Sequence, residues 1–364
     1  MPPLSIMIKP ASALCNMKCR YCFYHDVTDH RDVKNFGMIS EETTDKLIEK
    51  ALDFADGESV SFAFQGGEPT LRGIEYFKYF CKRVDELNIK SSKIHYGLQT
   101  NGTLINDEWA SFFREKNFLI GLSLDGDFEN NSFRVDGNNQ NAFYKILRAA
   151  DIFNKNGVQF NILTVLTGKC ADNIDGILRY FKKRGFRYLQ FIPCLRPFGD
   201  ETESELYMTP EQYKHFLIHG FNAYVKDYVQ GNYTSIRYFD NLVHLYLGNP
   251  TEQCGMCGHC MHQFVVEGNG NVYPCDFYCT DQWLLGNINS PAESFDTLAH
   301  CEKATNFLRE SLLVPEACKK CRFYPVCRAG GCKRSREDRN YCESYKAFFN
   351  ACLPLFRAFI AEKK

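Results

Sequence analysis

Short stretches rich in apolar and β-favouring residues alternate with helical patterns along the first half of the chain. Six such stretches lie at Leu4–Ile8, Ser59–Phe64, Lys93–Leu98, Phe118–Leu122, Val158–Leu166 and Tyr188–Ile192. Strands that alternate with helices indicate a parallel sheet with right-handed crossovers, so the predicted fold class is α/β. Six strand–helix units are too few for an eight-stranded barrel. A flat, doubly wound sheet is one arrangement that this pattern allows.

Helix signals fill the segments between the predicted strands. Ser40 fits an N-cap that is followed by Glu41 and Glu42, and Gly157 and Gly185 end two later helices. Apolar residues recur at a spacing of about 3.6 in three stripes. The stripes are Leu47, Ile48, Ala51, Leu52 and Ala55; Phe143, Ile146, Leu147, Ala150 and Phe153; and Ile174, Ile177, Leu178 and Phe181. Each stripe predicts a helix with one buried face.

Composition and charge restrict the functions open to this chain of 364 residues. Its hydrophobic content of 45% and charged content of 24% are typical of a globular protein. A net charge of −1 offers no basic surface for nucleic acid or an anionic membrane, and no apolar run could span a bilayer. The N-terminus lacks the pattern of a signal peptide. Eighteen cysteines without an export signal therefore indicate metal binding in the cytoplasm rather than disulfides.

The cysteines form two groups, which is the clearest indication of two domains. The first group has the spacing C-x3-C-x2-C and consists of Cys15, Cys19 and Cys22. A [4Fe–4S] cubane needs four ligands, usually four cysteines, so three leave one iron open to a small molecule. A zinc knuckle or a chance spacing is the alternative. The cysteines between the two groups are expected to be buried core thiols, namely Cys81, Cys170 and Cys194.

Polar and glycine-rich motifs follow the predicted strands at their carboxyl ends, where such folds place their chemistry. The two glycines of Gln65–Pro69 let the backbone approach a ligand closely. Gln99–Thr103 contains Asn-Gly, which is either a turn or a connection into a helix over Asn106–Lys116. Ser123 could bind a ribose, and Arg134 has the guanidinium fork that suits a carboxylate. An ordinary turn and a solvated surface arginine are the alternatives.

The cysteines of the C-terminal group also have the spacing of metal ligands. Nine residues separate Cys260 from Gly270, and four more separate Gly270 from Cys275. The pattern then continues as Cys318-x2-Cys321-x5-Cys327-x4-Cys332, followed by Cys342. These thiolates are enough for two fully ligated [4Fe–4S] cubanes. Zinc is the alternative, because C-x2-C knuckles also bind zinc.

Together these motifs resemble the radical S-adenosylmethionine (SAM) enzymes and their Cys-rich SPASM extension. A narrower resemblance, to the anaerobic sulfatase-maturating enzymes, extends over essentially the whole chain. It rests on the segments Ile8–Ser12, Phe62–Thr70, Ser235–Asp240, Cys254–Cys260, Gln263–Glu267 and Val272–Tyr278. The resemblance implies a partial (β/α)6 barrel with a connecting helix over residues 1–233. A SPASM-type domain with a short β-hairpin, helices and a C-terminal helix would occupy residues 234–364.

The resemblance also implies the cofactors and the residues that bind them. Cys15, Cys19 and Cys22 would ligate a [4Fe–4S] cluster whose free iron binds the amino and carboxylate groups of SAM. The residues expected to contact SAM are Tyr21, Gly66, Gly67, Glu68, Ser123, Arg134 and Leu195. One auxiliary [4Fe–4S] cluster would be ligated by Cys254, Cys260, Cys275 and Cys332. A second would be ligated by Cys318, Cys321, Cys327 and Cys342.

Three features depart from the family pattern. Four residues separate Cys327 from Cys332 where the family usually has three. One extra residue can shift a side chain by up to about 3.5 Å, so Cys332 is the expected ligand whose position most depends on the local backbone. Cys257 and Cys279 are extra thiols beside expected ligands, and we interpret both as bystanders.

The implied reaction is the oxygen-independent oxidation of a cysteine or serine side chain to Cα-formylglycine. A 5′-deoxyadenosyl radical would abstract hydrogen from Cβ, a base would remove the thiol or hydroxyl proton, and a second electron would leave. Asp276, beside Cys275, is the expected base. An ordinary aspartate has a pKa of about 3.9, so Asp276 would need partial burial to act near pH 7. Tyr24 and Gln65 are expected to contact the peptide.

The expected partners are an unfolded sulfatase polypeptide with the motif Cys/Ser-x-Pro/Ala-x-Arg and an electron donor such as flavodoxin or ferredoxin. We expect a monomer, in which the aromatic stretch Thr209–Tyr233 forms a helix that packs the two domains together. Three alternatives remain. They are a SPASM-type maturase that forms a thioether or carbon–carbon crosslink in a ribosomal peptide, a non-catalytic zinc protein, and a radical SAM enzyme of a small metabolite. The sequence leaves open the choice between Cys-type and Ser-type sulfatases.

Overall fold

The computed structural model describes residues 3–338 and 341–363, so the outer bounds of the predicted domains, residues 1 and 364, lie outside the described residues. The chain forms two compact units. Unit 1 contains Met1–Ser123, Arg134–Phe160 and His262–Phe307. Unit 2 contains Leu124–Phe133, Asn161–Met261 and Leu308–Lys364. These units divide the chain in a different way from a single boundary after residue 233, and that boundary stays a prediction.

The sheet of unit 1 has the strand order β10-β9-β8-β1-β2-β3-β4. Strands β1 to β4 pair in parallel, with Leu4 opposite Val60 and Val60 opposite Ile94. Strand β8 also runs parallel to β1 and forms an antiparallel hairpin with β9, which β10 extends. The bounds are β1 Leu4–Ile8, β2 Val60–Phe64, β3 Ile94–Thr100, β4 Leu119–Ser123, β8 Phe264–Val266, β9 Asn271–Tyr273 and β10 Gly286–Asn287. The expected hairpin is therefore present, and it extends the sheet of unit 1.

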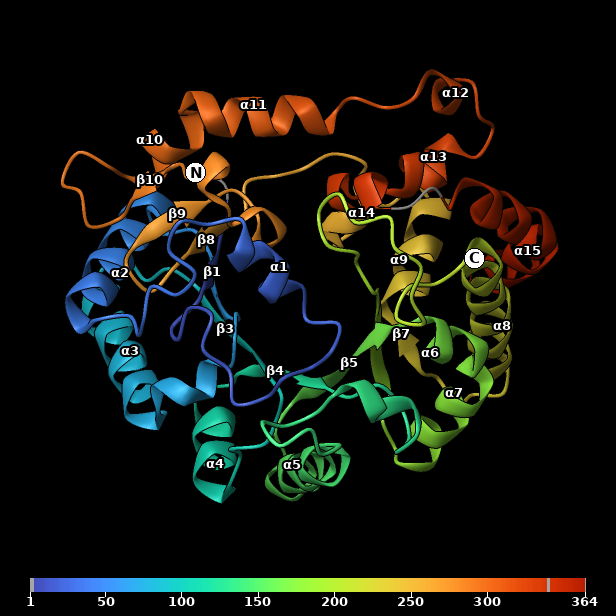
Figure 1. The fold of residues 1–364 in the computed structure, drawn as a ribbon, viewed down its shortest axis with the longest axis horizontal. Helices are drawn as coiled ribbons and strands as arrows, with labels where there is room; N and C mark the ends of the chain where they lie inside the picture. Colours follow the sequence, from blue (N-terminus) through green and yellow to red (C-terminus); the bar gives the residue numbers. More distant parts are fainter. Residues whose placement is uncertain (1–2, 339–340, 364) are drawn as a thin grey trace. The chain divides into compact units, whose positions relative to one another are not determined.

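The helices of unit 1 are α1 Phe23–Asp29, α2 Glu41–Ala55, η1 Pro69–Arg72, α3 Ile74–Leu87, α4 Asp107–Glu115, α5 Phe143–Asn156, η4 Asp276–Tyr278, η5 Asp281–Trp283, α10 Phe295–His300 and the start of α11 Glu302–Ser311. Helices α2 to α5 lie outside its strands (Figure 1). The predicted caps are confirmed. Ser40 Oγ accepts from Thr43 N at 3.1 Å at the start of α2, and Gly157 ends α5 with a φ of 68°.

Aromatic side chains fill the space between strands and helices in unit 1. Phe62 and Phe64 of β2 are buried, and each packs edge to face on Phe80 of α3, with ring centroids 5.1 and 5.0 Å apart. Such geometry stabilises aromatic pairs by about 0.5–1.5 kcal/mol beyond the area that they bury. The packed layer holds the strands in fixed positions, so the loops that follow β1, β2 and β3 start from a rigid edge.

Unit 2 contains three further parallel strands and most of the C-terminal helices. Strands β5 Phe160–Leu166, β6 Tyr188–Pro193 and β7 Ser235–Ile236 pair with Ile162 opposite Leu189 and Tyr188 opposite Ser235. The helices are η2 Asn130–Phe133, α6 Gly168–Asp172, α7 Ile174–Lys183, α8 Pro210–Val229, α9 Arg237–Tyr246, η3 Cys254–Met256, α12 Glu316–Lys319, α13 Tyr324–Cys327, η6 Arg328–Gly330, α14 Lys333–Asp338 and α15 Cys342–Lys363.

The predicted helix in Thr209–Tyr233 is α8, and it is a packing helix of unit 2. A capping box starts it, in which Thr209 Oγ1 accepts from Gln212 N and Gln212 Oε1 accepts from Thr209 N. Its buried face packs on α15, where the ring of Phe221 stacks on that of Phe356 at 4.1 Å. This burial explains the aromatic composition of the stretch.

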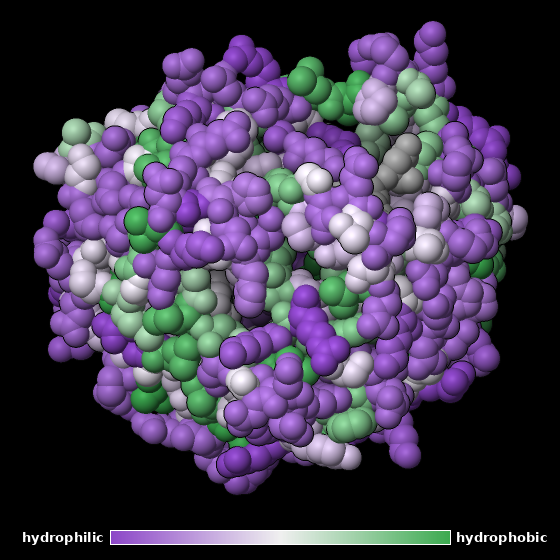
Figure 2. Space-filling view, viewed as in Figure 1, coloured by the Kyte–Doolittle hydropathy of each residue, from purple (hydrophilic) through white to green (hydrophobic). Residues whose placement is uncertain are grey.

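The six predicted strands are confirmed, with ends that differ from the expected ones by at most two residues. No helix in the described part of the chain is long and apolar enough to cross a membrane. Figure 2 shows a face made mostly of hydrophilic residues, with apolar residues scattered among them.

Candidate active site

The three N-terminal cysteines lie in the loop between β1 and α1, which we call the cysteine loop (residues 11–22). Cys22 is the N-cap of α1, and its N–H donates to Cys19 O at 3.2 Å, which folds the end of the loop into a turn. Tyr21 and Arg134 lie together at this loop, with the guanidinium carbon 5.4 Å from the ring centroid. The structure therefore brings two of the expected SAM contacts to the predicted cluster ligands.

The Gly-Gly-Glu turn after β2 packs directly on the cysteine loop. A Cβ added at Gly67, where φ is +51°, would lie 2.1 Å from Leu14 O. The next residue, Glu68, donates its N–H to the same carbonyl at 2.8 Å. Only glycine permits this approach, since any side chain would push the two loops apart. The turn thus has a structural reason for its second glycine in addition to the expected contact with SAM.

The carboxylate of Glu68 is fully occupied by donors from its own surroundings. Its Oε1 accepts from Thr70 N at 3.1 Å, Thr70 Oγ1 at 2.6 Å and Thr100 Oγ1 at 2.8 Å. Its Oε2 accepts from Asn101 N at 2.7 Å. Burial raises the pKa of Glu68 above its ordinary value, although these donors oppose the shift. The side chain joins the ends of β2 and β3. The predicted contact of Glu68 with SAM would therefore be made by its backbone.

Asn101, directly after β3, connects this turn to the cysteine loop. Its Nδ2 donates to Asn16 Oδ1 at 2.9 Å, and Asn16 Nδ2 donates in turn to Thr103 Oγ1 at 2.8 Å. The Asn-Gly motif is therefore a strand-to-helix connection that supports the cysteine loop. Sequence reasoning located the motif without this role, because Asn-Gly is so common in turns.

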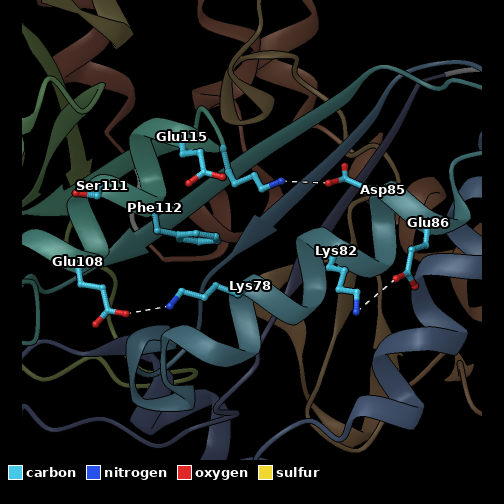
Figure 3. A pocket seen from close by; sticks show the side chains of 9 residues that line it. Lys78, Lys82, Asp85, Glu86, Glu108, Ser111, Phe112 and Glu115 are labelled. Carbon is cyan, nitrogen blue, oxygen red and sulfur yellow. Dashed lines mark hydrogen bonds and ion pairs between the residues drawn. The ribbon is translucent and has the colours of Figure 1, made fainter.

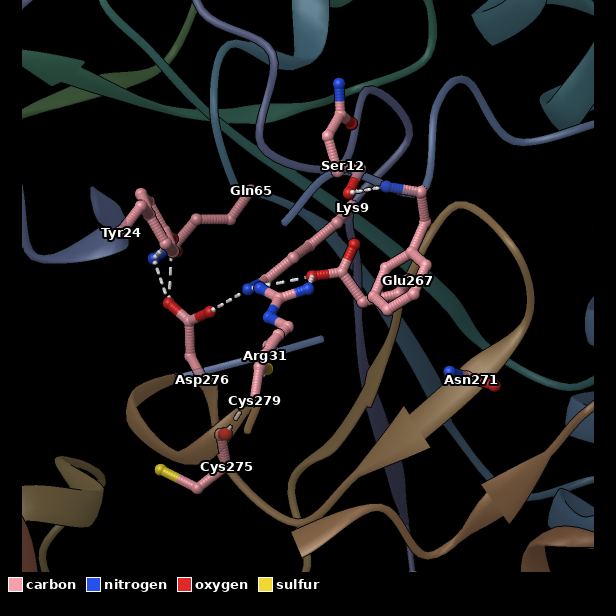
Figure 4. A network of polar contacts seen from close by, with 12 residues as sticks. Lys9, Ser12, Tyr24, Arg31, Gln65, Glu267, Asn271, Cys275, Asp276 and Cys279 are labelled. Atoms are coloured by element: carbon pink, nitrogen blue, oxygen red, sulfur yellow. Dashed lines mark hydrogen bonds and ion pairs between the residues drawn. The ribbon is translucent and has the colours of Figure 1, made fainter. Parts of the chain in front are cut away.

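The expected base and both expected peptide contacts lie together in unit 1 (Figure 4). Asp276, the first residue of η4, is buried, with 4% of its surface exposed. Its Oδ2 accepts from Tyr24 Oη at 2.7 Å and from Gln65 Nε2 at 3.0 Å. Burial and then the charge of Asp276 hold the pKa of Tyr24 well above its ordinary value, so Tyr24 stays a hydroxyl donor. The expected base is therefore buried, and both expected peptide contacts donate to it.

The other oxygen of Asp276 faces Lys9, which sequence reasoning missed. Lys9 Nζ lies 3.0 Å from Asp276 Oδ1 and 3.4 Å from Glu267 Oε1. Arg31 Nη1 donates to the same Glu267 oxygen at 2.8 Å. Burial lowers the pKa of Lys9, but the charges of Asp276, Cys279 and Glu267 outweigh it and raise that pKa above its ordinary value. The sequence signal that could have indicated Lys9 was a lysine directly after a buried strand, in Ile8-Lys9-Pro10.

Three cysteines of the first expected auxiliary set are neighbours in unit 2. The pKa of Cys254 is raised to about 12, first by burial and then by the thiols of Cys332 and Cys260. All four residues between Cys327 and Cys332 have left-handed backbone, with φ of 49° at Arg328, 59° at Ala329, 82° at Gly330 and 85° at Gly331. This coil keeps Cys332 beside Cys254. The fourth expected ligand, Cys275, lies in unit 1 as the N-cap of η4.

The second expected auxiliary set also gathers in unit 2. Burial raises the pKa of Cys327 to about 11, and the neighbouring thiols add to the shift. Those thiols are Cys342, Cys318 and Cys321.

The extra thiols, Cys257 and Cys279, instead donate to backbone carbonyls, at 3.7 Å to Gln253 and 3.5 Å to Cys275. These contacts support the interpretation that both are bystanders.

The remaining predicted residues occupy the places that their strands dictate. Ser123 is the last residue of β4 in unit 1 and is buried. Leu195 is half-buried two residues after β6 in unit 2. Their contacts with SAM stay predictions. The cysteines between the two groups are buried core thiols, as expected, namely Cys81, Cys170 and Cys194.

A pocket of about 660 Å³ lies elsewhere, on the outer helices α3 and α4 (Figure 3). Its charged side chains pair with one another. Lys78 lies 2.9 Å from Glu108, and Lys116 lies 3.1 Å from Asp85. None of the predicted site residues lines this pocket. It is a groove between surface ion pairs and is separate from the candidate active site.

The donor chemistry fits iron–sulfur clusters. No three histidine, cysteine or acidic side chains within residues 3–338 and 341–363 are arranged to hold a single metal ion. None of the eighteen cysteines, all of which lie in the described part of the chain, forms a disulfide. Every expected ligand is a cysteine, the ligand that these clusters take.

Glu68→Ala should lower the free energy of unfolding by about 3 kcal/mol, because it leaves the buried N–H groups of Thr70 and Asn101 without an acceptor. Urea unfolding of anaerobically prepared protein measures the effect. Glu58→Ala, at an exposed position, is the matched control and should change stability by no more than about 0.5 kcal/mol. Equal stabilities of the two variants would contradict the structural role of Glu68.

Comparison with known proteins places this site in a family. Residues 10–181 match the radical SAM superfamily, and residues 249–322 match an iron–sulfur cluster-binding domain. A cysteine-type anaerobic sulfatase-maturating enzyme of Clostridium perfringens (strain 13 / Type A) is 45% identical, and the match covers 97% of each chain. A serine-type anaerobic sulfatase-maturating enzyme of Bacteroides thetaiotaomicron is 30% identical, over 97% of this chain and 90% of the relative.

A solved structure described as native anSMEcpe with bound AdoMet and Cp18Cys peptide matches this one with a TM-score of 0.93 at 42% identity, covering 100% of both chains. The match confirms the expected fold class, a partial (β/α)6 barrel followed by a Cys-rich SPASM-type region. It also excludes the flat, doubly wound sheet. The chain belongs to the anaerobic sulfatase-maturating enzymes, which are radical SAM enzymes that carry auxiliary iron–sulfur clusters.

Proposed function

We propose that this protein oxidises a specific cysteine of a sulfatase polypeptide to Cα-formylglycine and thereby activates the sulfatase. The observation that supports this most is the buried Asp276 carboxylate, which accepts from Tyr24 and Gln65 in the same unit as the cysteine loop. A base in that position is what proton removal from a substrate thiol requires. The named activity of the similar enzymes agrees with it.

Cysteine is the better candidate than serine for the target side chain. The cysteine-type relative is 45% identical to this chain, against 30% for the serine-type relative, at the same 97% coverage of this chain. We infer that the substrate segment has the motif Cys-x-Pro/Ala-x-Arg and binds extended, because its side chain must come within a few ångströms of the reacting carbon.

The residues proposed to hold the cofactors are those of the cysteine loop and its neighbours. Cys15, Cys19 and Cys22 would ligate the first [4Fe–4S] cluster, while Tyr21 and Arg134 would line the SAM site. When bound, SAM and this cluster supply the one-electron chemistry that removes a hydrogen atom from the substrate Cβ. The two C-terminal cysteine sets would hold auxiliary [4Fe–4S] clusters that accept the second electron.

The protein's own contribution is to bind, orient and deprotonate the peptide. Asp276 takes the thiol proton. One hydrogen atom leaves Cβ and one further electron leaves the side chain, which becomes a thioaldehyde after losing two protons and two electrons in total. Water then replaces sulfur as the carbonyl oxygen, and hydrogen sulfide leaves. Tyr24 and Gln65 hold Asp276 Oδ2 by donating hydrogen bonds to it.

A small protein reductant such as flavodoxin or ferredoxin would deliver the electron that starts each turnover. We infer a monomer that works in the cytoplasm, since cysteine thiols stay reduced in that compartment. Co-purification from the native host tests for the protein reductant, and light scattering tests for the monomer.

The first experiment is anaerobic incubation of the iron-reconstituted enzyme with SAM, dithionite and a synthetic Cys-x-Pro-x-Arg peptide, followed by mass spectrometry. We expect the peptide to lose about 18 Da as 5′-deoxyadenosine is released. A Ser-x-Pro-x-Arg peptide should react more slowly. The variant in which Cys15, Cys19 and Cys22 are all alanine is the negative control and should release no 5′-deoxyadenosine. Release of 5′-deoxyadenosine without the mass change would indicate that the substrate is another peptide or a small molecule.

Asp276→Asn should keep 5′-deoxyadenosine release within about twofold and lower formylglycine formation about 100-fold, because the amide cannot accept the thiol proton. Quantifying both products in one reaction measures the effect. Asp53→Asn, an exposed position on α2, is the matched control and should behave as wild type. Full formylglycine formation by Asp276→Asn would show that another group is the base.

Gly331→Ala should displace Cys332 and lower the iron content from about twelve to about eight atoms per chain. A Cβ there would lie 1.9 Å from Gly255 O, so the coil that places Cys332 cannot form. Gly330→Ala is the matched control, because its φ is also positive but its Cβ would meet only a Tyr345 ring carbon at 3.7 Å. Iron and sulfide analysis compares them, and equal losses in both variants would refute the steric explanation.

A further inference from the structure

We propose that Lys9 is a positioning residue for the reaction, which holds Oδ1 of Asp276 so that the carboxylate faces the substrate thiol. The inference rests on the proposed function of Asp276 and goes beyond it, because it assigns a task to a residue outside the cysteine, glycine and aspartate motifs. It also gives the first glycine of the Gly-Gly-Glu turn a second task.

The geometry of Lys9 supports this role. Lys9 follows β1 directly and has only 1% of its surface exposed, although its ammonium group is strongly hydrated in water. Its Nζ lies 3.0 Å from Asp276 Oδ1 and 4.8 Å from the ring centroid of Tyr24. Lys9 thus contacts both the expected base and one of the two residues that donate to that base (Figure 4).

The stem of Lys9 occupies the space that a side chain at residue 66 would need. A Cβ added at Gly66 would lie 2.5 Å from Lys9 Cγ and 2.7 Å from Lys9 Cδ. The backbone at Gly66 also has a φ of +94°, which L side chains rarely adopt. The glycine therefore makes room for the lysine, and the turn that backs the cysteine loop is linked through Lys9 to Asp276.

The charges around Lys9 are balanced. Lys9 and Arg31 are the cations and Glu267 and Asp276 the anions of a buried network, in which Glu267 Oε1 is shared by both cations. Taking charges out of water costs more than most buried pairs return, so such a network is weak evidence for a purely stabilising role. Its specific effect is orientation, because Lys9 Nζ pairs with both Glu267 Oε1 and Asp276 Oδ1 and is thereby fixed in place.

The orientation of Asp276 depends on contacts at both of its oxygens. Tyr24 and Gln65 hold Oδ2, and the contact of Oδ1 is with Lys9. A carboxylate held at one oxygen only can rotate about its Cβ–Cγ bond. The contact with Lys9 opposes that rotation, and small errors in the placement of a reacting group lower rates strongly.

The test compares Lys9→Met with Arg31→Met in the full-length, iron-loaded enzyme. Both variants remove one buried cation from the network, but only Lys9 touches Asp276. We expect Lys9→Met to lower the yield of formylglycine per 5′-deoxyadenosine about tenfold, while Arg31→Met stays within about twofold of wild type. Iron content and SAM affinity should stay near wild type in both. An unchanged yield in Lys9→Met, or an equal loss in both variants, would overturn the proposal.

A double-variant cycle separates positioning from a general structural effect. If Lys9 acts through Asp276, then Lys9→Met combined with Asp276→Asn should have the same yield as Asp276→Asn alone. Multiplying losses would overturn the proposal. A crystal structure of Lys9→Met should show a rotated Asp276 carboxylate, and an unchanged carboxylate would count against the role of Lys9.

A conservative variant covers the case in which Lys9→Met fails to take up iron. Lys9→Gln keeps an N–H donor that can reach toward Oδ1, so its yield should lie between those of wild type and Asp276→Asn. A Lys9→Gln yield below that of wild type would support the role of Lys9, and a yield equal to that of wild type would overturn it. Absence of formylglycine from the wild-type reaction would instead refute the proposed function itself.

Discussion

The close approach of the Gly-Gly-Glu turn to the cysteine loop is the constraint on which the candidate site depends. Gly67 lies against Leu14 O, where a Cβ would be 2.1 Å from that oxygen, and Glu68 N donates to the same atom. The carboxylate of Glu68 then fixes the end of β3 through Thr100 and Asn101. The loops that follow three neighbouring parallel strands, β1, β2 and β3, are thereby held together at one edge of the sheet. The cysteine loop is one of them.

A second group of polar contacts holds the carboxylate of Asp276 in place. Tyr24 and Gln65 come from the segments after β1 and β2, whereas Asp276 comes from the hairpin region more than two hundred residues later. Strand β8 brings that region to the site by pairing in parallel with β1. The sheet that carries the cysteine loop therefore also carries the expected base, and the buried network around Lys9 balances the charge there.

Much of the architecture followed from local sequence signals. The alternation of apolar stretches with helical stripes predicted all six strands, and Ser40 and Gly157 are caps in the structure as expected. Such signals are local, since a cap or a stripe depends on residues within one or two turns. The role of Asn101 and the partner of Asp276 Oδ1 were missed, because they depend on contacts between segments far apart in the chain.

The sequence by itself determined the strand order along the chain, the cysteine spacings and, through the resemblance that they carry, the family and its cofactors. Only the tertiary structure decided how Cys332 stays beside Cys254 despite an extra residue, since that depends on four consecutive residues with positive φ, of which Gly331 lies against Gly255. It alone also placed Lys9 between Glu267 and Asp276. The spacing of two residues along the chain limits how far apart their side chains can lie. The direction in which a buried charge points is set by the groups that surround it in the folded protein.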